Sequence, residues 1–286
     1  MQRINYIIIT LLAALFSLPA ASQSRHTINI NTGWKFYKGE TIDASAATFD
    51  DSKWRTVDLP HDACMDETFV KDKNGANARN GYLPTSKGWY RRHISYEEKW
   101  TGNRAFIEFE GVYRDAKVFI NGKKVSDEQP NGYAGFVIDI TDVLTPGDNV
   151  IAVSYDNTYP KSSRWYNGEG INRDVFLHFT EPVHVAHDGT YITTPKITDK
   201  YARVSIATDV INQREDSVLC RLETEIIDPQ GNTVAKRIAV APFASGETYT
   251  FNQDLEVGSP QLWQVGKGIL YKAKSSLFID GKLSGN

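Results

Sequence analysis

Apolar and polar residues alternate along the segment 104–157, around which the rest of the chain is organised. Ala105, Ile107 and Phe109 fall on one face of a strand, with polar or mixed residues between them. An alternation with a period of two is typical of a strand that buries one face. No helix of useful length fits between the strands of this segment. We therefore predict an antiparallel β-sandwich built around it.

Turn residues separate the predicted strands. Asn121-Gly122 stands between two short runs with β propensity, 117–120 and 123–125. Asn-Gly is the strongest short hairpin signal, because a type I′ turn needs a positive φ at both central positions. Further strands are predicted at 136–140, 150–155 and 175–179.

Two strands and two long loops surround this segment. One entry strand is expected over 27–37 and another over 54–59, where Pro60 ends the pairing because it has no N–H to donate. The loops 66–84 and 157–170 both carry aromatic and charged residues. An aromatic ring with nearby amide and guanidinium donors suits a sugar, which presents an apolar C–H face and a rim of hydroxyls.

From Pro182 onward the pattern indicates a second sandwich. Apolar positions alternate over 204–210 and 218–226, and Asp228-Pro229-Gln230-Gly231 is a turn signal. Strands at 248–255 and 270–279 complete a spacing that is typical of an immunoglobulin-like fold. The expected domains are a first sandwich at 23–181 and an immunoglobulin-like sandwich at 182–286, preceded by a leader at 1–22.

The leader has the order of a secretory signal. Arg3 supplies a positive start, an apolar run follows from Tyr6 to Leu18, and small residues come next. The run is too short and too weakly flanked for a membrane span. Cleavage after Ser22 is expected, and with it an exported protein, periplasmic or secreted, with no membrane span.

Composition and charge exclude several function classes. The 286 residues carry a formal net charge of −3, and the 32 Lys and Arg are dispersed, so no nucleic-acid partner is expected. No cluster has the spacing of a metal site and no phosphate loop follows a strand, so we expect no cofactor. Cys64 and Cys220 are expected to be buried free thiols rather than a disulfide, which would need Cα atoms within about 7 Å.

A series of ordered motifs then points to a family. They are Leu59-Pro60-His61-Asp62, Gly88-Trp89-Tyr90-Arg91-Arg92, Phe109-Glu110-Gly111-Val112, Ile120-Asn121-Gly122, Asn131-Gly132-Tyr133, Asp139-Ile140-Thr141, the run from Trp165 to Val175, and Gln261-Leu262-Trp263 with Leu270-Tyr271. In these motifs and their order the chain resembles the β-galactosidase-like glycoside hydrolases of family 2. The resemblance covers nearly all of the chain after the leader.

This resemblance implies a jelly-roll, galactose-binding-like β-sandwich, then an immunoglobulin-like sandwich, then a (β/α)₈ barrel carrying two catalytic glutamates. The barrel is not among these residues. Retaining glycosidases need two carboxyls about 5 to 5.5 Å apart. The family's acid/base Glu usually follows an Asn, and no Asn-Glu pair occurs in this chain. We therefore expect no catalytic residue here, and a chain that is inactive alone.

Six residues are candidates for contact with a carbohydrate: His61, Asp62, Asn80, Tyr82, Arg164 and Trp165. The last two match the segment that lies against the substrate pocket in the family. Alternatives remain open for each of them. Trp165 can be a packing residue and Arg164 an ion-pair partner at a domain interface. His61 and Asp62 can cap the turn after Pro60, and the other two can belong to an ordinary turn.

Three functions are compatible with the sequence. The first is the non-catalytic N-terminal part of an exported β-galactosidase-type hydrolase, which binds carbohydrate only weakly without its barrel. The second is a stand-alone carbohydrate-binding or scaffold protein, and the third is a truncated product without a function of its own. The strand ending at Ile279 needs a partner from beyond Asp280-Gly281, where only 282–286 remain. An open edge of this kind predicts possible self-association and makes the second sandwich incomplete.

Overall fold

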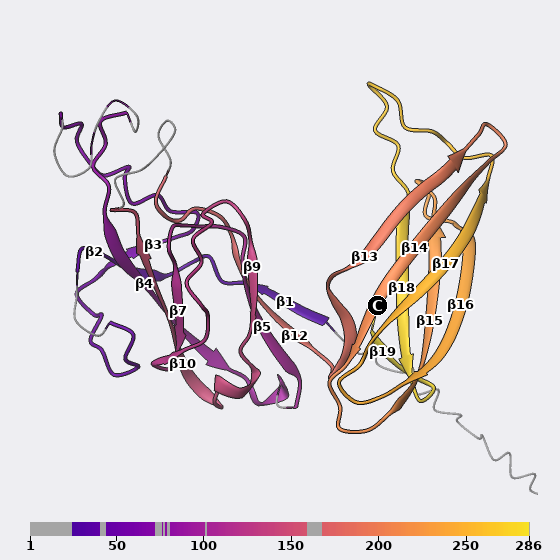
Figure 1. The fold of residues 1–286 in the computed structure, drawn as a ribbon, viewed down its shortest axis with the longest axis horizontal. Coiled ribbons are helices and arrows are strands. Elements are labelled where there is room, and N and C mark those ends of the chain that lie inside the picture. Colours follow the sequence, from indigo (N-terminus) through magenta and orange to yellow (C-terminus); the bar gives the residue numbers. More distant parts are fainter. Residues whose placement is uncertain are drawn as a thin grey trace, which may run out of the picture.

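The computed structural model describes residues 25–40, 44–71, 76, 78, 81–100, 102–158 and 168–285. Two β-sandwiches follow one another along the chain (Figure 1). The expected all-β fold class is thereby confirmed. The predicted leader, 1–22, lies outside the described residues. In the described part of the chain, no helix is long and apolar enough to cross a membrane.

The first sandwich pairs a four-stranded sheet, in the order β1-β12-β5-β9, with a six-stranded sheet, β3-β2-β4-β10-β7-β8. β6 and β11 form a separate two-stranded pair. The strands are β1 (Arg25–Asn29), β2 (Trp34–Lys38), β3 (Arg55–Val57), β4 (Lys87–Tyr96), β5 (Arg104–Phe109), β6 (Val112–Tyr113), β7 (Lys117–Ile120), β8 (Lys123–Lys124), β9 (Phe136–Asp139), β10 (Gly147–Asp156), β11 (Gly170–Ile171) and β12 (Val175–Thr180), with 3-10 turns at Glu98–Trp100 and Thr141–Val143.

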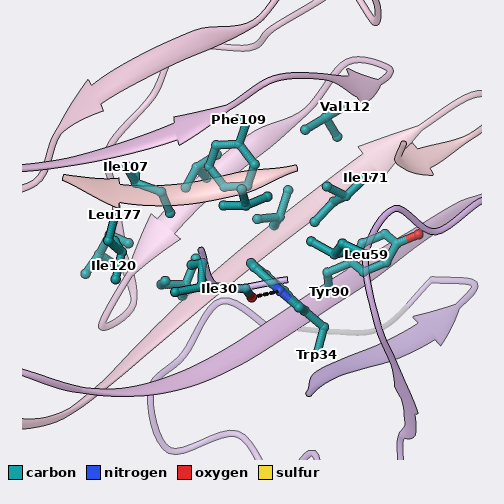
Figure 2. Packing of buried hydrophobic residues seen from close by; sticks show 14 of the residues in the cluster. Ile30, Trp34, Leu59, Tyr90, Ile107, Phe109, Val112, Ile120, Ile171 and Leu177 are labelled. Carbon is teal, nitrogen blue, oxygen red and sulfur yellow. Dashed lines mark hydrogen bonds between the residues drawn. The ribbon is translucent and has the colours of Figure 1, made fainter. Parts of the chain in front are cut away.

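The core of this sandwich confirms the alternation seen in the sequence. Ala105, Ile107 and Phe109 of β5 are buried, as are Tyr90 and Ile151 of the facing sheet. Figure 2 shows Trp34 within this core, where its Nε1 donates to the carbonyl of Ile30 at 2.7 Å. Complete burial of one Val, Leu, Ile or Phe side chain contributes roughly 1.5–3 kcal/mol. The two sheets are therefore held mainly by apolar packing.

The Asn-Gly hairpin is also confirmed. Asn121 and Gly122 have φ values of 51° and 84°, and they join β7 to β8. The entry strand predicted over 27–37 is wrong in one respect, because the chain breaks at Gly33, with a φ of 74°. Consequently β1 pairs with β12, whereas β2 pairs with β3 and β4 in the other sheet. One predicted strand is two strands on opposite layers.

The second sandwich pairs a three-stranded sheet, β13-β14-β17, with a four-stranded sheet, β16-β15-β18-β19. Its strands are β13 (Val183–Ile197), β14 (Tyr201–Asn212), β15 (Val218–Ile227), β16 (Thr233–Phe243), β17 (Thr248–Gly258), β18 (Lys272–Ile279) and β19 (Lys282–Gly285). β19 pairs with the last three residues of β18. The strand ending at Ile279 thus has a partner in β19, and the expectation that its edge is open is wrong for these three residues.

The two sandwiches meet where β12 passes into β13. A guanidinium nitrogen of Arg25 donates to the carbonyl of Val185 at 2.8 Å. The ring of Phe106 meets that of His184 edge-on, with centroids 5.5 Å apart. Both contacts cross from the first sandwich to the start of the second. Cys64 and Cys220 are buried and free, as expected, and each lies in its own sandwich.

Candidate functional site

The candidate site lies at the base of the segment 159–167, which carries two of the predicted contact residues. Arg164, Trp165 and Asn80 lie outside the described residues. His61 is placed at this base, because its N–H donates to the carbonyl of Ile171 at 2.8 Å. The N–H of Ala63 likewise donates to the carbonyl of Glu169 at 2.9 Å. The structure thus pairs the His61-Asp62 segment with the residues that follow 159–167.

Tyr82, the remaining candidate, closes a different loop. Its carbonyl accepts a hydrogen bond from the N–H of Val70 at 2.9 Å. The residue has a φ of 62°, in the left-handed region, and its side chain is 38% exposed. An exposed phenol at a loop closure is sterically open to a ligand.

The Asp62 carboxylate binds backbone N–H groups from two separate segments of the site. One carboxylate oxygen, Oδ1, accepts from the N–H of Cys64 at 2.9 Å and from the N–H of Glu169 at 3.0 Å. A Cβ at Gly168 would lie 2.9 Å from the other oxygen, so a larger residue here would require the Asp62 carboxylate to shift. Asp62 therefore ties the turn after Pro60 to the end of the 159–167 segment.

His61 is held in the neutral form by its partners. Its Nε2 accepts from the Arg55 guanidinium at 2.8 Å, so Nδ1 carries the proton and donates to the Tyr90 hydroxyl at 2.7 Å. The ring also packs against Phe36, with centroids 4.7 Å apart. Burial first, and the Arg55 charge second, lower the pKa of His61. This ring is a fixed neutral support rather than a proton donor in acid–base chemistry.

Glu169 is the centre of the site, and sequence reasoning missed it. The residue is 0% exposed. One carboxylate oxygen accepts from the N–H of Ser86 at 2.9 Å and from the amide of Asn157 at 3.1 Å. The other accepts from the Ser86 hydroxyl and lies 3.6 Å from the Lys38 ammonium. A buried carboxylate is tolerated only when it is satisfied in this way.

The residues around Glu169 come from four separate parts of the first sandwich. Lys38 ends β2, Ser86 precedes β4, Asn157 follows β10, and Glu169 itself precedes β11. The last two flank the 159–167 segment on either side. One carboxylate therefore joins the described residues on the two sides of 159–167 to each other and to the sandwich.

A cleft of about 550 Å³ opens beside Lys38 and Ser86, two partners of this carboxylate. Lys38 reaches its edge and pairs with Glu67 at 2.7 Å. Charged and hydroxyl side chains take part in the lining, which includes Lys38, Glu40, Glu67, Ser86, Lys87 and Thr158. Such groups can donate to and accept from sugar hydroxyls.

The chemistry of the site supports binding rather than bond cleavage. Asp62 and Glu169 are already occupied by backbone, hydroxyl and amide donors. A retaining mechanism instead needs a nucleophile and an acid facing an open scissile bond. In the described ranges, no group of three or more His, Cys, Asp and Glu could hold a metal ion.

Family models match both sandwiches. The model described as glycosyl hydrolases family 2, sugar binding domain, matches residues 26–182. The model described as glycosyl hydrolases family 2 matches residues 183–285. Together they cover the described chain almost from end to end.

Relatives and solved structures agree with this assignment. The chain is 36% identical to the β-galactosidase BoGH2A of Bacteroides ovatus over 86% of this chain and 29% of that relative. It is 30% identical to a β-glucuronidase of Formosa agariphila over 92% of this chain and 29% of the relative. A solved glycosyl hydrolase family 2 member from Bacteroides cellulosilyticus superposes with a TM-score of 0.84 at 31% identity, over 91% of this chain and 34% of that one. The chain thus spans about a third or less of the length of these proteins.

Proposed function

Because this chain belongs to glycosyl hydrolase family 2, we propose that it is the non-catalytic N-terminal part of an exported β-galactosidase-type glycosidase. In this proposal the hydrolysis of O-glycosyl bonds takes place on a (β/α)₈ barrel outside these 286 residues. The first sandwich supplies one wall of the sugar pocket, through Arg164 and Trp165. The second sandwich connects that wall to the barrel.

The observation that carries this proposal is the anchoring of the 159–167 segment by Glu169. A residue that completes a substrate pocket must be held to within about 0.5 Å, and its supporting hydrogen bonds provide that precision. The Glu169 carboxylate is 0% exposed, and burying a charge costs free energy. An ordinary surface loop does not need a support with this cost. Such a support is appropriate for a segment that presents an aromatic ring and a guanidinium to a sugar.

Glu169→Gln tests this support. The amide keeps the shape of the side chain but turns one acceptor into a donor that faces Asn157 or Ser86. We expect a loss of about 2 kcal/mol in unfolding free energy, together with faster amide exchange at 157 and 168–171. Glu67→Gln is the matched control, because Glu67 pairs with the same Lys38 but keeps 30% of its side chain exposed. Such a pair contributes less than about 1 kcal/mol, so equal losses in the two variants would contradict the anchoring role.

Turnover tests the non-catalytic part of the proposal. The purified chain should not hydrolyse nitrophenyl β-galactoside or nitrophenyl β-glucuronide, because in this proposal both catalytic glutamates belong to the barrel. Activity that survives exhaustive purification, and disappears when a Glu or Asp of this chain is replaced, would show that the chain is an enzyme.

Sugar affinity tests the single-wall arrangement. With the other walls of the pocket on the barrel, a monosaccharide should bind the 159–167 site with a Kd no better than about 1 mM, near −4 kcal/mol. Trp165→Ala should abolish this binding. Trp263→Ala is the matched control, because Trp263 is a 61% exposed tryptophan of the second sandwich.

A stand-alone carbohydrate-binding protein is the second candidate, and the cleft beside Lys38 favours it. The cleft has a volume of about 550 Å³, within the usual range of ligand sites. Micromolar binding of a sugar by this chain, lost in Trp165→Ala, would support this second function over the first.

Export is the remaining part of the proposal, and it rests on the order of residues in 1–22. Expression with the native N-terminus followed by fractionation and N-terminal sequencing checks it. The exported protein should begin at Gln23, and a product that stays in the cytoplasm with Met1 intact would refute export.

A further inference from the structure

A second hollow lies on the outer face of the β13-β14-β17 sheet, in the second sandwich. It has a volume of about 240 Å³. The side chains of β13, β14 and β17 that point outward around it are Tyr191, Thr193, Ser205, Ala207, Asn252 and Asp254. They combine one aromatic ring, one methyl group and four hydrogen-bonding groups.

The strand register arranges these residues in two rows. Tyr191 lies opposite Ala207, which in turn lies opposite Asn252. In the next row of the same face, Thr193, Ser205 and Asp254 are paired in the same way. Ala207 is the smallest side chain of its row, so it forms a floor between the tyrosine ring and the amide.

Tyr191 is 71% exposed, which is unusual for a ring in the middle of a strand pair. Aromatic residues in sheets normally pack against a large cross-strand neighbour, and that contact stabilises the sheet. Here the cross-strand neighbour is Ala207, whose methyl group covers little of the ring. The ring therefore contributes little to the sheet and leaves a face open toward the hollow.

The opposite wall is polar and held in place. Oδ1 of Asp254 accepts from the Ser205 hydroxyl at 2.5 Å, and Oδ2 is paired with Arg203. These bonds fix the carboxylate, whose side chain stays 52% exposed. Among the described residues, the amide of Asn252 makes one long hydrogen bond, of 3.5 Å, to the carbonyl of Thr250. Both groups have capacity left for a ligand.

We propose that this hollow binds one sugar unit of a glycan, as an accessory site separate from the proposed pocket wall. The apolar face of a sugar ring stacks on an aromatic ring, and its hydroxyls need donors and acceptors around the edge. The hollow offers both, on opposite sides of a small floor. A protein partner fits less well, because charged residues are depleted from the centres of protein interfaces and Arg203 and Asp254 stand beside this hollow.

An accessory site of this kind would hold the enzyme on a polymeric substrate. This goes beyond the proposed function, because it uses the second sandwich and needs neither the barrel nor the 159–167 segment.

Chemical-shift titration of the ¹⁵N-labelled 286-residue chain tests the inference, with lactose, cellobiose and methyl β-glucuronide as probes. At least one probe should shift the amides of Tyr191, Ala207 and Asn252 with a Kd in the millimolar range. Tyr191→Ala should weaken this binding about five-fold or more, as expected for the loss of a stacked ring. Tyr191→Phe keeps the ring and should retain binding.

Two control variants make the result specific. Thr250→Ala alters the same outward face of β17 outside the hollow, and it should leave the affinity unchanged. Trp165→Ala should also leave these shifts intact, so failure of the proposed pocket wall and failure of this site are separable. The inference is overturned if no probe perturbs the three amides up to its solubility limit, or if Tyr191→Ala binds as tightly as the unmodified chain.

Discussion

The junction between the two sandwiches should lose stability in mild acid because of His184. This residue is the second of β13, and its Nδ1 donates to the carbonyl of Glu181 at 2.9 Å. It is only 8% exposed and packs edge-on against Phe106 of the first sandwich. Burial above all, with the Arg25 and Arg104 charges adding to it, lowers the pKa of His184 to about 4.

The sign and size of the effect follow from this pKa. In the unfolded chain the imidazole has its ordinary pKa of about 6.5. As the pH falls below 6.5, His184 binds a proton in the unfolded state but stays neutral in the folded state. Protonation therefore stabilises the unfolded state, and the free energy of unfolding decreases. The loss reaches about 2 kcal/mol at pH 5 and about 3 kcal/mol at pH 4.

Urea unfolding at pH 7.5 and at pH 5 measures this loss, and NMR titration of the ring gives its pKa directly. His184→Asn keeps a donor for the Glu181 carbonyl but cannot titrate. The variant should be less stable at pH 7.5, because it loses the contact with Phe106, yet it should lose about 2 kcal/mol less than the unmodified chain on acidification.

The matched control is His187→Asn. His187 lies on the same strand with its side chain 43% exposed, 3.8 Å from Glu108 and 3.4 Å from Asp188. Because His187 lacks the burial that acts on His184, this variant should lose as much stability on acidification as the unmodified chain. If the unmodified chain and His184→Asn lose stability in parallel, the reasoning is wrong.

Two further predictions concern the first sandwich and the thiols. Gly170→Ala would place a methyl carbon 2.0 Å from the Tyr90 hydroxyl at a φ of 95°, so we expect a loss of about 3 kcal/mol in urea unfolding. Gly231→Ala, at a φ of 91° with nothing within 4 Å, should cost only about 1 kcal/mol, and equal losses would argue against the clash. Burial raises the pKa of Cys220 to about 12 and also raises the pKa of Cys64, so a maleimide should label both only in denaturant. Rapid labelling of the native chain would show that these thiols are accessible.

The fold could be predicted well wherever one face of a strand is buried. β5, β12 and β14 alternate regularly between buried and less buried positions, and the sequence shows the same period. β13 and β16 were not predicted, because neither strand buries one continuous face. Most positions of both strands are exposed or half-buried. A strand that buries little apolar surface leaves little hydrophobic period in its sequence.

The break between β1 and β2 shows a second limit. The apolar positions of 27–37 keep a single phase, so the pattern favours one strand. Gly33 takes a left-handed conformation there, and the N–H of Gly33 is held by Asp58 at 2.8 Å. This bond comes from a residue 25 positions away. Such a contact has no local signature, because the pattern of a strand does not show which sheet it joins.

The candidate site illustrates the same limit for charged groups. A period-of-two pattern treats every Glu and Arg as a surface residue, yet Glu169 and Arg91 are both 0% exposed. Each is stable only because residues far away in the sequence satisfy it: Ser86, 83 positions from Glu169, and Asp51, 40 positions from Arg91. The turn signals around His61 and Gly168 locate the loops but not the group that joins them. Because such a charge costs free energy unless every partner is in place, its position is set by the finished fold.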